Sequence, residues 1–197
     1  MARQAKPIQK TNIKVPNGFV LPPKTQWGYT PPLWDSSAHE IFGNILTGTE
    51  LAKHVTLHHD GVGSNFAIRP PAEGIGLDFE FEQFSGSFMS IAFGFPEKAA
   101  KSIGRHDLLR ISVISSADKS FQAYARLNLR HGPNNEQIIR MIDIGDGESF
   151  AEFDIFYTEF EPNRASDAWI DLIINNPANC KFSLSDVVIL RRVRASL

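Results

Sequence analysis

Polar and apolar side chains alternate along residues 119–130, KSFQAYARLNLR. Successive side chains on a strand point to opposite faces, so one face would carry Gln122, Tyr124, Arg126, Asn128 and Arg130. Planar guanidinium and amide groups hydrogen-bond sugar hydroxyls and carboxylates, and a tyrosine ring can stack on a pyranose. The pattern predicts a ligand-binding face. The alternative is a solvated sheet face whose charges prevent edge pairing.

The next residues, RHGPNNEQIIR at 130–140, contain a Gly-Pro-Asn-Asn turn that connects two strands. Asn134 and Asn135 follow the proline, and their amides could contact a ligand. They could equally cap the backbone of the turn itself. Both interpretations stay open.

The sequence gives less support to metal binding, phosphate binding or catalysis. On a strand, His54 and His58 would lie ~13 Å apart, too far to bind one ion, and no third ligand has a matching spacing. We therefore expect no metal and no cofactor. Phosphate-binding and nucleophile motifs are absent from the sequence. Acidic pairs such as Asp78 with Glu80, and those at 152–154, leave a glycan-active enzyme as a third alternative. We expect no enzyme and assign no catalytic residue.

A period of two dominates from Leu51 onward and predicts about ten strands with short turns. In GIGLDFEFEQF the apolar residues would face the core and the acids solvent. The only predicted helix covers 96–104, PEKAAKSIG. Fifteen phenylalanines predict a Phe-rich interior. The fold class is all-β: an antiparallel β-sandwich of jelly-roll type with one short helix and an extended N-terminal arm.

The arm is residues 1–34, and the predicted β-sandwich domain is 35–197. The arm carries five basic residues and no acid, and it holds six of the twelve prolines. Because the net charge of the whole chain is −2, residues 35–197 carry a net charge of −7. Trp27, Tyr29 and Trp34, within WGYTPPLW, are expected to anchor the arm on the domain. Alternatively, this segment only plugs the end of the sandwich. The basic residues expected to bind a partner protein are Arg3, Lys6, Lys10 and Lys14.

The composition also limits location and partners. The chain has one cysteine, no apolar run long enough for a membrane span and no apolar signal segment at its start. We expect assembly in the cytoplasm without a signal peptide and no membrane insertion. The acidic body argues against nucleic acid as a partner.

Five stretches resemble a bacterial family of unknown function: WGYTPPLW (27–34), VTLHHD (55–60), GSFMSIAFGFPEKA (86–99), ARLNLRHGPNNEQIIR (125–140) and FDIFYTEFEPNRASDAWIDLI (153–173). The resemblance implies a β-sandwich and brings no catalytic residues. The chain also resembles the member of this family used in head spikes of a gene transfer agent, a phage-like particle.

That second resemblance implies a non-enzymatic structural and attachment role, most simply as the head-spike base on the particle surface. The protein would link the capsid vertex to a receptor-binding fibre or to cell-surface polysaccharide. Its partners would be a capsid protein and another spike protein, and it would form a homo-oligomeric vertex ring. The alternative is a free carbohydrate-binding β-sandwich module.

Overall fold

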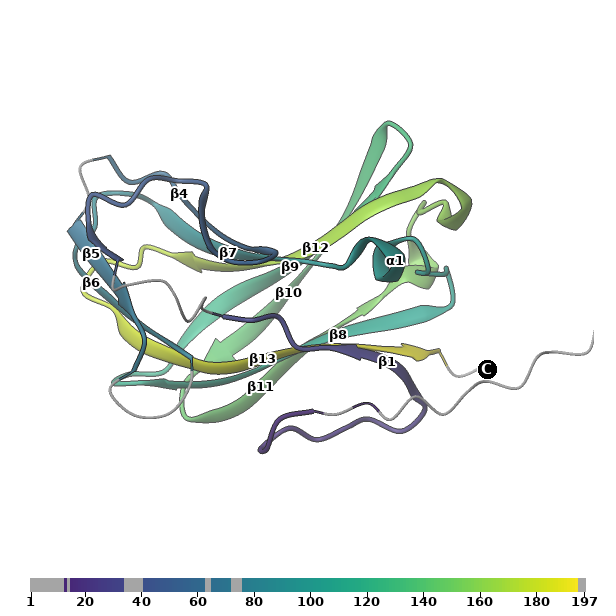
Figure 1. Cartoon of the computed structure of the whole chain (residues 1–197), viewed down its shortest axis with the longest axis horizontal. Coiled ribbons are helices and arrows are strands. Elements are labelled where there is room, and N and C mark those ends of the chain that lie inside the picture. The colour runs from purple at the N-terminus through teal and green to yellow at the C-terminus, as the bar shows by residue number, and fades with distance from the viewer. Residues whose placement is uncertain (1–12, 14, 34–40, 63–64, 72–75, 195–197) are drawn as a thin grey trace, which may run out of the picture.

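The computed structural model describes residues 13, 15–33, 41–62, 65–71 and 76–194, and these form two facing antiparallel sheets (Figure 1). The seven-stranded sheet has the order β11 (Gly147–Asp154), β8 (Asp107–Ala117), β13 (Lys181–Val193), β6 (Leu77–Gln83), β5 (Asn65–Arg69) and β2 (Ile41–Gly43), with β1 (Thr25–Tyr29) also paired to β13. The six-stranded sheet has the order β10 (Asn134–Ile144), β9 (Phe121–His131), β12 (Ala165–Asn175), β7 (Phe88–Gly94), β4 (Val55–His59) and β3 (Thr49–Ala52). The predicted antiparallel β-sandwich is confirmed.

The core lies between the sheets and is built from the alternation seen in the sequence. In β6, Leu77, Phe79 and Phe81 are at most 1% exposed, whereas the acidic residues between them reach solvent. The Phe79 ring stacks on Phe182 of β13 with 4.7 Å between centroids. Aromatic side chains bury large apolar areas and prefer such offset contacts. The predicted Phe-rich interior is therefore present in the described residues.

The helical segments are short. They are α1 (Glu97–Ala100) and the 3-10 turns η1 (Ile155–Tyr157) and η2 (Pro162–Arg164). The helix predicted for 96–104 is thus correct in place but spans only four residues. No helix in the described ranges is long and apolar enough to cross a membrane.

Strand β11 is shorter than its sequence pattern. Alternation in ESFAEFDIFYTEF (148–160) favours a strand through Phe160, but β11 ends at Asp154. The Asp154 carboxylate accepts a hydrogen bond from the Phe156 N–H at 3.1 Å and begins η1. This local side-chain bond competes with the strand pattern, which alternation alone does not reveal.

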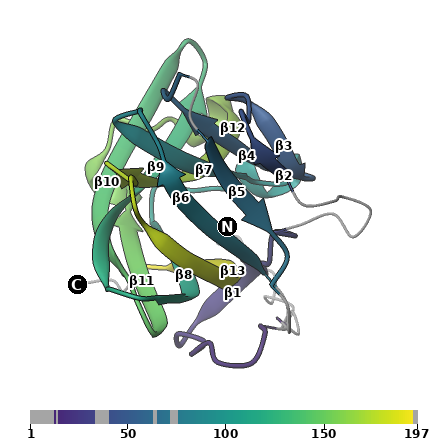
Figure 2. The same cartoon turned by 90° about the vertical axis from the view of Figure 1, so that its left-hand side faces the viewer.

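The first described strand, β1, extends the sheet where another strand stops. β13 pairs with β6 through residues 181–184 and with β1 through residues 189–192, so β1 occupies the edge that β6 leaves open (Figure 2). The Trp27 ring lies 6.1 Å from that of Tyr29 and 5.8 Å from that of Phe95, at the end of β7. The residues just before 30 therefore pack against both sheets.

Strand β13 has a bulge at Leu184 to Asp186 that leaves an aspartate only 8% exposed. Burial raises the pKa of Asp186, and the hydrogen bond from the Val187 N–H only partly offsets it. A folded-state pKa above the unfolded value means that the ionised carboxylate destabilises the fold above that pKa, and that this penalty disappears as the pH falls.

Asp186→Asn should therefore melt a few degrees above the wild type at neutral pH, since the amide keeps an acceptor without the charge. The difference should shrink in mild acid. Thermal unfolding followed by circular dichroism at both pH values measures it. If the variant melts below the wild type at neutral pH, the ionised Asp186 carboxylate does not destabilise the fold.

A candidate ligand groove on the six-stranded sheet

The outer face of the six-stranded sheet brings together side chains from strands far apart in sequence. In one row across the sheet, Asn128 of β9 lies opposite Trp169 of β12, which lies opposite Gly94 of β7. In the next row Asp171 lies between Arg126 and Ala92. The face therefore carries a polar half over β9 and β12 and a half of small residues over β7.

The polar half is held by one buried carboxylate. Asp171, with a side chain 5% exposed, accepts hydrogen bonds at Oδ2 from Arg126 Nε at 3.0 Å and Nη2 at 2.8 Å, and from Asn128 Nδ2 at 2.9 Å. Gln137 Nε2 of β10 donates to Asn128 Oδ1 at 2.8 Å. Asn128 is 0% exposed. Arg126 and Asn128 thus tie three strands together. Asn128 is buried and bonded through both its oxygen and its nitrogen, so it has little capacity left for a ligand. Arg126 spends two of its five donors on Asp171, and its side chain is 35% exposed.

A groove of about 470 Å³ runs over β7. It lies within the size range of ligand sites in proteins. Ala92 and Gly94 form its floor. A methyl group and a hydrogen atom rise little above the backbone of β7, whereas the side chains on the neighbouring strands are larger. The groove is lined by His54, Thr56, His58, Ala92, Gly94, Phe95, Glu97, Arg130, Ser166, Asp167 and Trp169.

The aromatic wall of the groove is Trp169, which is partly exposed. The guanidinium carbon of Arg130 lies 5.4 Å from the centroid of its ring, within cation–π distance. The groove thus offers an indole that Arg130 holds in place. Hydroxyl, imidazole and carboxylate groups surround this indole.

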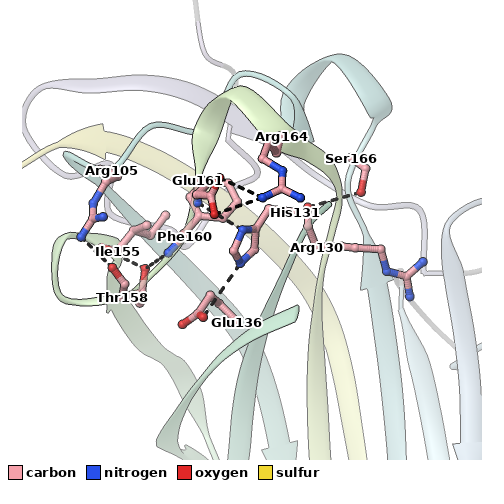
Figure 3. Close-up of polar contacts among 10 residues, drawn as sticks. All are labelled: Arg105, Arg130, His131, Glu136, Ile155, Thr158, Phe160, Glu161, Arg164 and Ser166. Atoms are coloured by element: carbon pink, nitrogen blue, oxygen red, sulfur yellow. Dashed lines mark hydrogen bonds and ion pairs between the residues drawn. The ribbon is translucent and has the colours of Figure 1, made fainter. Parts of the chain in front are cut away.

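Arg130 is positioned by the root of the β9–β10 hairpin (Figure 3). The next residue, His131, points to the opposite side of β9 and is 1% exposed. Its Nδ1 accepts a hydrogen bond from the Glu161 N–H at 3.4 Å, and its Nε2 lies 3.9 Å from a Glu136 carboxylate oxygen. The Gly132 N–H donates to the Arg164 carbonyl at 3.0 Å. Contacts from Glu136 of β10 and from the η2 turn therefore fix the base of the hairpin, next to Arg130, which lines the groove.

The structure places four of the predicted ligand-binding residues on one face but not in one site. Tyr124, Arg126, Asn128 and Arg130 alternate outward on β9, as expected, and of these only Arg130 lines the groove. Asn134 and Asn135 are exposed at the start of β10 and lie outside the groove lining. The binding roles assigned to these residues stay predictions, and the groove is lined mainly by residues of β4, β7 and β12.

Two signals in the sequence indicate the floor and the wall of the groove separately. In GSFMSIAFGF every outward position from Ser90 to Gly94 is small, which is typical of a low floor. In DAWIDLI, Trp169 stands at an outward position between two acids, where an isolated core residue is not expected. The pairing of these two strands, however, could not be read from either segment.

The basic residues of the arm, Arg3, Lys6, Lys10 and Lys14, lie outside the described residues, as does Trp34. The predicted capsid and spike partners, the vertex ring, and the particle location therefore stay predictions. Trp27 and Tyr29 are described and pack as given above.

Three of the acids that suggested an enzyme, Glu80, Glu152 and Asp154, are paired with cations. The Lys181 ammonium and the Arg69 guanidinium hold the pKa of Glu80 below its usual range. Glu152 pairs with Arg192 at 3.1 Å, and Asp154 with Arg194 at 2.9 Å. Within the described ranges, no group of three or more His, Cys, Asp or Glu side chains is placed to hold a metal.

A second hollow, of about 380 Å³, lies over the seven-stranded sheet. Its lining includes Glu80 with its two cations and Asp78, which accepts a hydrogen bond from Ser183 at 2.6 Å. Its two phenylalanines, Phe79 and Phe182, are at most 3% exposed. The hollow therefore presents paired charges and no accessible aromatic surface, and it is the weaker candidate.

Fold and groove together define a β-sandwich with an open groove on the outer face of one sheet. The chain belongs to a family of unknown function, DUF6478, whose model matches residues 3–197. No curated protein matches the chain.

Among solved structures, the chain is similar to a family 11 carbohydrate-binding module from Clostridium thermocellum in complex with a β-1,3-1,4-mixed-linked tetrasaccharide, at TM-score 0.48 and 10% identity, covering 81% of this chain and 100% of that one. It is also similar to the family 11 module of the cellulase Lic26A-Cel5E from the same organism, at TM-score 0.47 and 12% identity, over 82% and 99% of the chains. A third is the enzymatically active domain of tailspike protein 4 from bacteriophage CBA120, at TM-score 0.48 and 10% identity, over 75% and 21%. At these scores the similarities identify neither a ligand nor a site in this chain.

Proposed function

We propose that this protein binds a polysaccharide, without altering it, in the groove over β7. The observation that carries the proposal is Trp169: a partly exposed indole at the wall of a groove whose floor consists of small residues. An indole face packs well against the apolar face of a sugar ring, and the surrounding polar groups can bind its hydroxyls. A solvated outer sheet face has no need of such an aromatic wall.

The carboxylates of the groove support binding rather than hydrolysis. Asp167 Oδ1 accepts a hydrogen bond from the Ala168 N–H at 2.9 Å. Glu97 forms an ion pair with Lys101 at 2.5 Å, and that hydrogen bond lowers its pKa. A glycosidase needs one carboxyl group whose pKa is raised so that it can act as an acid. Glu97 does not meet that requirement, because its pKa is lowered.

The direct test is Trp169→Ala, titrated calorimetrically with mixed-linkage β-glucan, xylan, alginate and capsular polysaccharide from a bacterium that carries this protein. We expect the affinity for the polysaccharide that binds to fall at least about tenfold, because central aromatic anchors dominate binding energies.

The matched control is Tyr157→Ala. Tyr157 is 73% exposed and lies outside the groove lining, so its removal should leave affinity unchanged. If the wild-type protein binds none of these polysaccharides, or if Trp169→Ala binds as tightly as the wild type, the proposal is wrong.

A further inference from the structure

We propose that His54 and Trp169 face each other across Gly94 and hold one sugar ring of the ligand between them. This inference rests on the proposed function and adds to it the position of the ligand and a second contacting residue. The ligand class is a glycan with at least one pyranose whose apolar face is free to stack.

The three residues lie in one row that crosses β12, β7 and the turn just before β4. Trp169 is the direct neighbour of Gly94 in the ladder between β12 and β7. On the other side, the Gly94 N–H donates a hydrogen bond to the His54 carbonyl at 2.8 Å. Neighbouring strands lie about 4.8 Å apart, so the two walls are separated by roughly 10 Å of backbone spacing. That gap admits a single pyranose ring between the side chains.

The backbone at His54 carries the second argument. His54 is in the turn between β3 and β4, not on a strand as its spacing from His58 had suggested, and its φ is +66°. Glycine adopts this conformation at little cost, whereas other residues are disfavoured there. A non-glycine residue with this backbone is uncommon, and such backbone gathers at ligand sites. His54 is exposed and lines the groove.

Gly94 differs from His54 because its φ is not in the left-handed region, so its backbone does not require glycine. A methyl group at this position would meet its nearest atoms, the His54 Cβ and carbonyl oxygen, at 3.5 Å, which is ordinary contact. The fold therefore accepts alanine at residue 94. The absence of a side chain there serves the groove, because a methyl group would raise the floor between the walls.

The two walls offer different chemistry to the ring between them. The indole of Trp169 provides a flat apolar surface, and an imidazole provides a second flat face together with ring nitrogens that can hydrogen-bond hydroxyls. Gly94 leaves room for the ring between them. The arrangement predicts recognition of one sugar unit in particular, with looser contact along the remaining groove.

His54→Gly tests the inference with two readouts. Removing the side chain should lower the affinity for the polysaccharide that the wild type binds about tenfold, because one of the two walls is lost. The melting temperature should stay equal or rise, because glycine relieves the left-handed backbone. The matched control is Lys53→Gly, at the exposed neighbouring turn position outside the groove lining, which should leave affinity unchanged.

Gly94→Ala is the second variant. It should melt like the wild type and bind the same polysaccharide about tenfold more weakly, since the methyl group occupies the space of the ring. If Trp169→Ala loses binding while His54→Gly and Gly94→Ala both bind as the wild type does, the groove binds glycan but the two-wall arrangement is wrong. If the wild type binds none of the polysaccharides, the proposed function fails and this inference fails with it.

Discussion

Gly76→Ala should destabilise the protein by roughly 3 kcal/mol or more, the largest loss we expect from a single methyl group in this fold. Gly76 has φ +116°, where L side chains are strained. A Cβ at this position would lie 2.1 Å from the Leu184 carbonyl oxygen and 2.7 Å from the Ser185 Cα. Both are backbone atoms at the bulge of β13, so no side chain can move aside. Urea denaturation followed by tryptophan fluorescence measures the loss.

Gly147→Ala is the matched control. Its φ of +107° is close to that of Gly76, but a Cβ there meets nothing within 4 Å. It should therefore cost only the backbone strain, about 1 kcal/mol. The difference between the two variants isolates the clash with β13. Equal losses would show that β6 and the bulge of β13 are not packed as described.

Asp171→Ala should cost about 2–3 kcal/mol, the second large effect. The change removes three hydrogen bonds at one oxygen and leaves Asn128, which is 0% exposed, with one donor fewer satisfied. It also leaves Arg126 without its counter-ion. Because the Arg126 side chain is 35% exposed and can reach water, we expect less than the full penalty of a buried unpaired charge.

Asp167→Ala is the control on the same strand and face. Asp167 is exposed and makes only a local bond to the Ala168 N–H, so its loss should be within about 0.5 kcal/mol. The double variant Arg126→Met with Asp171→Leu should recover much of the stability, since apolar groups can replace a partly buried pair. A single Asp171→Ala variant as stable as Asp167→Ala would contradict the central role of this carboxylate.

The strand pattern was accessible from the sequence because the period of two is local. Leu77, Phe79 and Phe81 could be assigned to the core, and Tyr124 with Arg126 to the outer face, from neighbouring residues alone. Features set by a single side chain, such as the end of β11 at Asp154, do not follow from alternation. Strands as short as β2 and β3, with three and four residues, give too few alternations to detect.

The groove could not be predicted because it depends on contacts between distant strands. The partner of Arg126 is 45 residues away, and nothing near Arg126 indicates that Asp171 occupies its guanidinium. In the same way, Trp169 becomes a wall only because its neighbour in the ladder is Gly94, and that register is set by the whole sandwich. Residue types and alternation indicate which side chains are able to bind sugars, whereas the strand order decides which of these side chains lie next to one another.

The small residues on the outer face of β7 give this scaffold an unusual freedom to evolve. The strand's inward residues Met89, Ile91 and Phe93 are at most 1% exposed, and the intervening residues shape the floor of the groove. Because alternate side chains point to opposite faces, enlarging Ala92 or Gly94 changes the depth of the groove without touching the core. The residues that fill the core and those that shape the groove are thus different residues of one strand. If the groove binds glycan as proposed, substitutions at these outward positions can change what is bound while the fold is kept.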